Sequence, residues 1–323
     1  MNILLTGASG LVGQHLLSKL SAGAFRIRAL SLHGEPQKKF TSWDTKRVEW
    51  VVADIQDFTQ LPDVLSGIDL VIHTAAKVSY DPRERDAMLE VNVTGTENLV
   101  NAMLDRQIPR LIHFSSIAAL GQPAPAELTR EETPYEEKEQ TTYYGKSKHL
   151  AELEVWRGMA EGLEVLVLNP GIILGEGDEE RSSSNLFHIV RNEFPYYTSG
   201  STGWVDVADL CEIVWRFLHQ PQAWNQRYIC VGQNASFREV FTQMANHMQV
   251  KPPHRYAGPL LTALVWRLYY VKCLLVGGQA TITRETAASA HRQQAYDHSR
   301  LLGALPDFQF NTLENTLQRI LNR

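Results

Sequence analysis

The sequence predicts an α/β protein with a doubly wound parallel sheet and a smaller, mainly helical C-terminal lobe. Short apolar runs alternate with segments of helical periodicity over the first half of the chain, which is typical of parallel strands joined by helices. Most runs are continuously apolar, as expected of strands covered by helices on both faces. The predicted strands are Ile3–Leu5, Ile27–Leu30, Val48–Val52, Leu70–Ile72, Leu111–Phe114 and Val165–Leu168.

The regular alternation ends after Pro170 and Gly171. The later chain has the pattern of helices joined by loops that contain Gly and Pro, with one further strand at Arg227–Val231. We therefore expect residues 1–170 to form the sheet domain. Residues 171–323 would form the smaller lobe, with part of this chain returning to the sheet.

Composition favours a globular protein that binds small molecules. The 323 residues include 44% hydrophobic residues, enough for a sizeable core. The formal net charge is −5 and no long run of one sign occurs, so nothing predicts a nucleic-acid surface or a polybasic membrane patch. Because the strand-like run Asn2–Thr6 follows Met1 directly, no secretory signal is expected.

The cysteines and acidic residues predict neither disulfides nor a metal site. Cys211, Cys230 and Cys273 lie far apart, so buried thiols in a reducing cytoplasm are expected. The densest acidic stretch, Glu131–Glu139, is predicted to be a solvated loop.

A glycine-rich loop follows the first predicted strand. Residues 6–13 read TGASGLVG and precede the amphipathic run Gln14–Leu20. Glycines let the backbone approach a pyrophosphate, and a helix N-terminus offers N–H groups and a positive dipole end. The GxxGxxG spacing is one residue longer in its first interval than the common fingerprint, and a purely structural turn is the alternative. The candidate phosphate-binding residues are Gly7, Ser9, Gly10, Leu11, Val12 and Gly13.

Other predicted strand ends supply further candidate cofactor contacts. Asp54 and Ile55 follow the third strand, where the carboxylate could accept the adenine amino group or act only as a surface cap. Small residues follow the fourth strand and would let the backbone approach a cofactor. They are Thr74, Ala75 and Ala76, and they follow His73, which we interpret as a packed core histidine and not a base.

The end of the second strand bears on cofactor choice. NAD-specific sites place an acidic residue there to bind the adenine ribose. Here Ser31 and His33 could instead donate to a 2′-phosphate, and Lys38 or Lys39 could add charge. We therefore predict a modest preference for NADP over NAD.

Tyr144 and Lys148 lie four residues apart in a helical segment and share one helix face. A neighbouring ammonium would favour tyrosinate and lower the phenol pKa toward working pH, and the lysine could also hold the nicotinamide ribose. This spacing also occurs by chance on solvated helices. Ser115 and Ser116 supply context because they end the fifth strand, where an open α/β sheet binds its ligands. Together a serine, the tyrosine and the lysine could polarise a carbonyl and protonate the alkoxide, with hydride delivery left to the cofactor.

From Met1 to about Leu321, the chain resembles the extended short-chain dehydrogenase/reductases, or NAD-dependent epimerase/dehydratase family. The resemblance rests on TGASGLVG, Ala53-Asp54, His73–Ala76, NVTGT at 92–96, FSSIAALG, YGKSKHLAE and Asn169-Pro170-Gly171, in the family's order. It implies a Rossmann fold with Ser116 as catalytic serine, Ser115 as its neighbour, Tyr144 as proton donor or acceptor, and Lys148 as its partner. Further residues would border the cofactor, namely Asn92, Asn169, Pro170 and Gly171.

Within that family, two segments resemble the dihydroflavonol-reductase and 3β-hydroxysteroid-dehydrogenase branch, Gly203–Asp209 and Tyr296–Arg300. Ile117 and Ala118 stand where dehydratases usually carry an acidic pair, which disfavours dehydration. The leading hypothesis is an oxidoreductase that reversibly reduces a small carbonyl bound by the lobe of residues 171–323. The alternatives are a nucleotide-sugar epimerase with tightly held NAD and a dinucleotide-sensing regulatory protein.

Three features outside these motifs carry further expectations. Lys77 could contact substrate or be a solvated charge. The apolar run Leu260–Val276 is interrupted by Arg267 and Lys272, so we predict a buried or groove-lining helix over the substrate pocket, with a peripheral membrane contact as the alternative. A two-fold homodimer is predicted because the family packs the tyrosine helix into a four-helix bundle, and this helix carries an apolar stripe of Leu150, Leu153 and Trp156.

Overall fold

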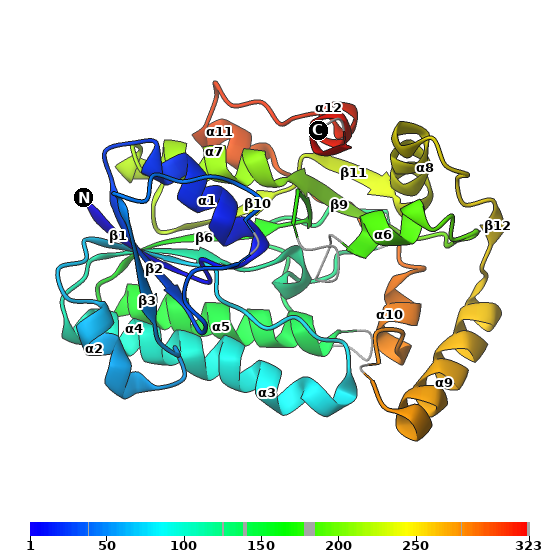
Figure 1. Cartoon of the computed structure of the whole chain (residues 1–323), viewed down its shortest axis with the longest axis horizontal. Coiled ribbons are helices and arrows are strands. Elements are labelled where there is room, and N and C mark those ends of the chain that lie inside the picture. Colours follow the sequence, from blue (N-terminus) through cyan, green and yellow to red (C-terminus); the bar gives the residue numbers. More distant parts are fainter. Residues whose placement is uncertain (38, 125, 138–140, 178–184, 279, 322–323) are drawn as a thin grey trace.

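In a computed structural model, a seven-stranded parallel sheet lies at the centre of the molecule (Figure 1). The predicted doubly wound α/β fold is confirmed. The structure describes the chain except residues 38, 125, 138–140, 178–184, 279 and 322–323. The strand order is β3-β2-β1-β4-β5-β6-β10. The strands are β1 (Asn2–Thr6), β2 (Arg26–Ser31), β3 (Val48–Val52), β4 (Leu70–His73), β5 (Arg110–Phe114), β6 (Glu164–Pro170) and β10 (Gln226–Cys230).

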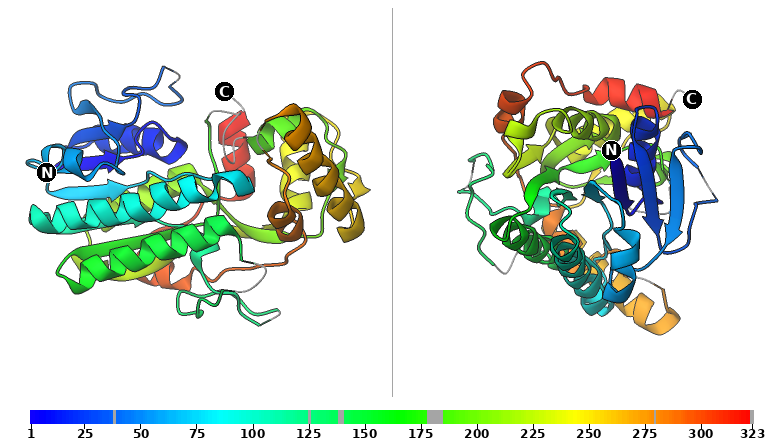
Figure 2. Two further views of the ribbon diagram at one scale, coloured as in Figure 1. Left: turned by 90° about the horizontal axis from the view of Figure 1, so that it is seen from below. Right: turned by 90° about the vertical axis from the view of Figure 1, so that its left-hand side faces the viewer.

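Helices cover both faces of this sheet. On one face lie α1 (Leu11–Ser21) and α7 (Val207–Phe217), and on the other lie α2 (Leu61–Val64), α4 (Gly95–Asp105) and α5 (Tyr143–Ala160) (Figure 2). Because successive strand residues point to opposite faces, β1 sends Ile3 and Leu5 into one core and Leu4 into the other. This explains why the strands are apolar at consecutive positions.

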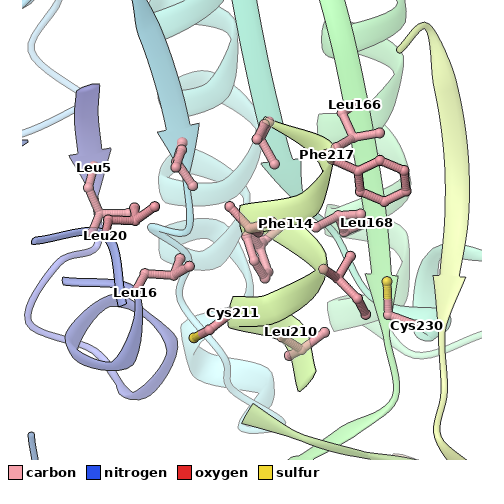
Figure 3. Packing of buried hydrophobic residues seen from close by; sticks show 14 of the residues in the cluster. Leu5, Leu16, Leu20, Phe114, Leu166, Leu168, Leu210, Cys211, Phe217 and Cys230 are labelled. Carbon is pink, nitrogen blue, oxygen red and sulfur yellow. The ribbon is translucent and has the colours of Figure 1, made fainter. Parts of the chain in front are cut away.

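The larger of the two cores lies between the sheet and the pair α1 and α7. Figure 3 shows Leu16 and Leu20 of α1 on the same side of the sheet as Leu210 of α7. They pack with strand residues such as Phe114 and Leu168, and all five side chains are at most 5% exposed. Removing a side chain of this size from such a core leaves a cavity that the surroundings cannot fill, so the core keeps the strand ends in place.

Short helical turns complete the sheet domain. A single helical path runs through α3 (Arg85–Leu89), the π-helical turn η3 (Glu90–Thr94) and α4. The 3-10 turns are η1 (Phe58–Gln60), η2 (Pro82–Glu84), η4 (Ile117–Ala119) and η6 (Pro221–Ala223).

The chain after β6 builds the lobe and also returns to the sheet through α7 and β10. The lobe strands are β7 (Ile172–Leu174), β8 (Tyr196–Tyr197), β9 (Ser201–Asp206), β11 (Gln233–Ser236) and β12 (Arg255–Tyr256). Its helices are α6 (Asn185–Arg191), α8 (Phe237–Met248), α9 (Pro259–Val276), α10 (Arg284–Ser289) and α12 (Leu313–Leu321). The helix α11 (Ser299–Ala304) instead packs on the sheet core beside β10. Trp204, Val240 and Leu317, each at most 1% exposed, belong to a separate lobe core.

The late apolar run forms the helix α9, but the prediction that it is buried is wrong. Leu260 is 89% exposed, Leu268 63% and Leu275 81%. The apolar pattern predicted a helix correctly, whereas burial depends on a tertiary partner that does not cover this face. Among the described residues, no helix combines the length and apolarity needed to cross a bilayer.

Candidate active site

The glycine loop and the residues after β4 meet where the strand order reverses. β1 and β4 are neighbours in the sheet although β2 and β3 separate them in sequence, and such a switch point is the usual ligand site of an open α/β sheet. Gly7 has φ +68° and a Cβ there would lie 2.6 Å from the Ala75 nitrogen. A Cβ on Gly13 would lie 2.3 Å from the Gly7 carbonyl oxygen. The two glycines therefore allow the loop and the first turn of α1 to pack directly on the sheet edge.

The tip of this loop is open. Ser9 and Gly10 are exposed, and Leu11 and Val12 are partly exposed at the start of α1. Gly10 is the N-cap of α1, which carries no side-chain cap hydrogen bond and no acidic residue in its first turn. The helix thus presents backbone N–H groups and its positive dipole end, which fits the pyrophosphate of a dinucleotide.

His73 is part of the support beneath this loop. Its Nδ1 lies 2.7 Å from the Thr6 hydroxyl and its Nε2 lies 3.0 Å from the Thr96 hydroxyl. Burial, together with the positive charge of Lys148, lowers the pKa of His73 to about 3. The ring is therefore neutral at physiological pH, in agreement with the interpretation of a packed core histidine. Thr74 donates its hydroxyl hydrogen to the Thr6 carbonyl at 2.7 Å. This hydrogen bond holds the chain after β4 against the glycine loop, where Ala75 lies next to Gly7.

Asp54 and Ile55 lie where β3 ends. The Asp54 carboxylate accepts a hydrogen bond from the Gln56 backbone N–H at 2.9 Å, the geometry of a surface turn. Ile55 is 5% exposed, and its side chain occupies the space that a Cβ on Gly95 would need, at 2.7 Å. The Ile55 side chain is therefore packed in the core, whereas Asp54 stays partly exposed in the turn after β3.

The residues proposed to bind a 2′-phosphate are unequally available. The Ser31 hydroxyl is buried and is engaged in the turn, because it donates to a backbone carbonyl at 2.6 Å and accepts from the His33 N–H at 3.3 Å. Lys39 pairs with Glu35 at 2.5 Å, and Lys38 lies outside the described residues. The imidazole of His33 is exposed. Because Ser31 is buried and Lys39 is paired with Glu35, His33 is the main candidate for this contact.

Tyr144 and Ser116 come together because α5 begins directly against the turn after β5. The Thr142 side chain caps α5 by accepting from the Gly145 N–H at 3.0 Å, and a Cβ on Gly145 would lie 2.4 Å from the Ala118 carbonyl oxygen. A side-chain hydrogen bond joins the Ser116 hydroxyl to the Tyr144 phenol. The neighbouring Ser115 hydroxyl is buried and has no partner among the described residues.

Lys148 lies one turn further along α5 and is 2% exposed. Its Nζ donates at 2.6 Å to the backbone carbonyl of Phe114, which is the last residue of β5. Burial lowers the pKa of Lys148 to about 8, and the negative charge of Glu152 opposes this shift. The ammonium is thus held at the carboxyl end of the sheet by an uncharged acceptor.

The direction predicted for the Tyr144 pKa is wrong for this structure. Burial raises the pKa of the phenol above its ordinary value, and the nearby Tyr80 adds to the increase. The hydrogen bond with Ser116 opposes it. The neighbouring ammonium favours the phenolate, but loss of hydration on burial disfavours the charged phenolate more strongly. Tyr144 is therefore protonated in this structure and suited to donate a proton.

A buried ion pair that the sequence analysis missed supports this site. Glu152 is fully buried one turn after Lys148 and forms an ion pair with Arg227 of β10. It also accepts from the Asn169 amide at 2.7 Å, and the same amide donates to the Ser116 carbonyl at 2.9 Å. The signals available in the sequence were an acidic residue four positions after the lysine and an arginine in a predicted strand.

Asn92, Pro170 and Gly171 have structural surroundings that the motifs did not predict. The Asn92 side chain accepts from the Lys77 N–H at 2.7 Å and donates to the Ser147 hydroxyl at 2.9 Å. It therefore ties the chain after β4 to α5. Pro170 ends β6, and a Cβ on Gly171 would lie 2.4 Å from a backbone carbonyl of β9. The Lys77 ammonium lies 3.2 Å from Glu84 and is partly exposed.

The lobe contacts the N-terminus of α5 through α10, a contact that was not predicted from the sequence. The Glu285 carboxylate accepts from the Tyr143 N–H at 3.1 Å and pairs with Arg85 at 2.7 Å. Arg85 also lies over the Tyr143 ring, 3.4 Å from its centroid. Tyr80 approaches the Tyr144 ring edge-on at 6.3 Å. These contacts join segments far apart in sequence and enclose the phenol from the lobe side.

The acidic stretch Glu131–Glu139 was predicted to be a solvated loop, but its first residue is buried. Glu131 is 8% exposed and accepts from the Ile229 N–H of β10 at 2.9 Å. Residues 138 and 139 lie outside the described residues. No group of three or more His, Cys, Asp or Glu side chains in the described ranges is placed to hold a metal ion.

The geometry fits a dinucleotide cofactor, and a family model agrees. Residues 3–232 match the model of the NAD dependent epimerase/dehydratase family. The chain belongs to this family. The match spans the glycine loop, the serines after β5, the tyrosine helix and β10, so the resemblance deduced from the motifs is confirmed.

The proteins that are similar to this chain include some named as reductases and some named as epimerases. A Synechocystis protein provisionally named dihydroflavonol 4-reductase is 23% identical over 93% of this chain and 88% of its own. Cinnamoyl-CoA reductase 1 of Petunia hybrida is 26% identical over 71% of this chain and 72% of its own. The solved structure of a UDP-glucose 4-epimerase with UDP-glucose from Thermotoga maritima has a TM-score of 0.78, 16% identity, and coverage of 100% and 98%. The chain is thus similar in sequence to proteins named as reductases and similar in fold to an epimerase.

Proposed function

We propose that this family member is an NAD(P)-dependent oxidoreductase that reversibly reduces a small carbonyl compound to an alcohol. The observation that carries the proposal is the hydrogen-bonded pair of Ser116 and Tyr144, with the Lys148 ammonium one turn away at the end of β5. The named reductase relatives support the direction of the reaction. A cytoplasmic location is part of the same proposal, since the three cysteines are buried and a reducing compartment suits them.

The residues divide the chemistry among them. The Ser116 hydroxyl would hold the carbonyl oxygen beside the Tyr144 phenol, and the bound nicotinamide would supply hydride to the carbonyl carbon. The phenol proton then passes to the oxygen as the alkoxide develops, so the product gains one hydride and one proton. Lys148 would bind the ribose and keep positive charge near the phenolate that remains. General acid assistance of this kind contributes roughly 10²- to 10⁴-fold to the rate.

For the cofactor we propose a modest preference for NADP over NAD. The end of β2 and the residues after it read Leu30-Ser31-Leu32-His33, without the carboxylate that would bind the ribose diol and repel a 2′-phosphate. The exposed His33 could donate to the phosphate. Calorimetric titration with NADPH and NADH separately checks this, and tighter binding of NADH would reverse the assignment.

A screen for cofactor consumption tests the proposed reaction. The protein is incubated with NADH or NADPH and a panel of carbonyl compounds, and loss of the reduced cofactor is measured. A parallel panel of nucleotide sugars is analysed for epimerised product. Net consumption with a carbonyl supports the reductase, whereas sugar epimerisation without consumption supports the epimerase, whose fold this chain shares.

Cofactor binding with neither activity would instead favour a dinucleotide-sensing regulatory protein. That alternative has no need of a buried lysine or of a serine paired with a tyrosine. Both features are present here, and they support an enzyme.

A further inference from the structure

The helix α9 carries an unusually exposed apolar face. Its sequence contains no Asp or Glu, and one side of it packs on the protein through residues such as Trp266 and Cys273. The opposite side exposes eight large apolar side chains, each at least 40% accessible. They are Leu260, Leu261, Leu264, Val265, Leu268, Val271, Leu275 and Val276. A continuous apolar surface of this kind on a globular protein usually marks an interaction site.

The segment of the chain that contains this face is positively charged. From residue 240 to residue 284 there is no Asp or Glu, whereas the segment holds five Lys and Arg residues. The segment therefore has a net charge of +5, and because the whole chain has −5, the remainder has −10. Arg267 and Lys272 lie within α9 and are exposed, and the Arg267 guanidinium donates to the Ala263 carbonyl of the same helix at 2.6 Å. The cations are Lys251, Arg255, Arg267, Lys272 and Arg284.

We propose that α9 is an interfacial helix that docks this protein on an anionic lipid bilayer. Its apolar face would enter the boundary between headgroups and acyl chains, with Arg267 and Lys272 at the level of the phosphates. Trp266, Tyr269 and Tyr270 are partly buried on the same helix, and such aromatic residues are enriched at membrane interfaces. The helix does not cross the bilayer, which agrees with the absence of a spanning helix in the described part of the chain.

A lipid surface fits these observations better than a second copy of the chain. If two α9 helices packed face to face, four cations would be brought together without a carboxylate from either helix. An anionic lipid bilayer would cover the apolar face of α9 with acyl chains and place lipid phosphates beside Arg267 and Lys272. The position of α9 at the edge of the molecule leaves this face free to meet a plane (Figures 1 and 2).

The docking helix is connected to the candidate active site. After α9, the Ala280 N–H donates to the Asp81 carboxylate at 2.8 Å, and Arg83 donates to the Gly278 carbonyl at 2.5 Å. The following helix α10 then places Glu285 against the N-terminus of α5. Bilayer contact would therefore hold the lobe side of the catalytic tyrosine close to the membrane surface.

Vesicle sedimentation tests the proposal without any assay of turnover, so its result is independent of the proposed reaction. The full-length protein is mixed with heavy vesicles of phosphatidylcholine alone or with added phosphatidylglycerol, and the bound fraction is measured at low and high salt. We expect binding to the anionic vesicles that weakens with salt. The double variant Leu264→Ser with Leu268→Ser should lower the partition coefficient about tenfold or more, because two side chains lose their burial in lipid.

Two further variants complete the experiment. Arg267→Gln with Lys272→Gln should reduce binding to anionic vesicles while leaving the apolar contact, and Phe58→Ser should bind like the unchanged protein. Phe58 is a suitable control because it is 39% exposed and lies in η1, far from α9. All substituted residues are exposed, so melting temperatures should be unaltered. Failure of the unchanged protein to bind, or equal binding of the Leu variant, would overturn the proposal. A dimer that the Leu variant converts to monomer, without vesicle binding, would identify a second copy as the occupant.

Discussion

Adjacent tyrosines at the start of α5 have different surroundings and should have different functions. The Tyr144 phenol is hydrogen-bonded with Ser116 and its pKa is raised by burial, whereas Tyr143 is 37% exposed and stacks under Arg85. We expect Tyr144→Phe to lower kcat about 10²- to 10⁴-fold, because one proton donor is lost while the ring stays. Steady-state kinetics on the substrate found by the screen provides the measurement.

The neighbouring residues supply controls for this variant. Tyr143→Phe should retain near-normal turnover, because its ring contact with Arg85 does not need the hydroxyl. Cofactor affinity should survive in Tyr144→Phe but fall in Lys148→Met, which also loses the proposed ribose contact. Normal turnover of Tyr144→Phe, or inactivity of Tyr143→Phe, would show that the catalytic assignment is wrong.

Lys148 provides a prediction about pH. Burial lowers its pKa to about 8 and Glu152 opposes the shift, so removing the Glu152 charge should lower this pKa further. If the ammonium is required for reduction, the rate falls as pH rises through the Lys148 pKa. In Glu152→Gln this fall should begin at a lower pH, which a pH–rate profile of kcat detects.

Loss of stability must be separated from this effect. Glu152→Gln leaves Arg227 without its buried partner, at a cost of about 3–5 kcal/mol. Glu152→Gln combined with Arg227→Met removes both charges and should recover much of the stability while keeping the shifted profile. Glu152→Asp should restore the original profile. An unshifted profile in a folded Glu152→Gln protein would show that Glu152 has only a structural role.

The residues proposed as catalytic could be selected from the sequence, whereas the contacts that support them could not. Ser116, Tyr144 and Lys148 stand in local motifs, and the predicted strand end and helix were enough to bring them together. The contacts of Glu152 with Arg227 and of Tyr143 with Glu285 join residues 75 and 142 positions apart, and no local pattern reports such pairs. The same limit explains the wrong direction for Tyr144, because its burial is a tertiary property.

Among the elements, the glycine loop and α1 act as one unit. A Cβ on Gly13 would lie 2.3 Å from the Gly7 carbonyl oxygen, so Gly13→Ala must displace either the loop or the helix. We expect about 1–3 kcal/mol of lost stability and a clear loss of cofactor affinity. Thermal unfolding and calorimetric titration measure the two effects.

Gly303 in α11 is the matched control for Gly13. It is also helical, but a Cβ there meets no atom within 4 Å. Gly303→Ala should leave cofactor binding unchanged and stabilise the protein by up to about 1 kcal/mol, from helix propensity. Equal behaviour of the two variants would show that close packing of the glycine loop is unimportant.

The elements also show which patterns in the sequence were informative. Every predicted strand is present with its ends within two residues, because continuous apolar runs bounded by loop residues are specific for a covered sheet. The helix α9 was correctly predicted as a helix, but of the two positions expected for it, buried or groove-lining, the buried one is wrong. An apolar run reports which residues avoid water, and it does not say whether a core, a partner or a lipid surface covers them.

At the scale of the whole molecule, α5 is the element that would bring two copies together. In the predicted apolar stripe, Leu153 is 49% exposed, whereas Leu150 and Trp156 are partly buried. Trp156 packs against the core beneath α4 and α5, so the stripe is only partly available to a partner. These two helices lie side by side along one face of the molecule (Figure 2). Packing them against a two-fold copy would bury Leu153 near the centre of a four-helix bundle.

We therefore expect light scattering at micromolar concentration to give the mass of a homodimer. Leu153→Glu should convert it to monomer, because two carboxylates would be buried near the two-fold axis without partners. Phe194→Glu is the control, since Phe194 is 50% exposed but belongs to the lobe, and this variant should remain dimeric. The double variant Leu264→Ser with Leu268→Ser should also remain dimeric if α9 meets lipid and α5 meets the second copy. A monomer mass for the unchanged protein, or a dimer that persists in Leu153→Glu, would contradict assembly through α5.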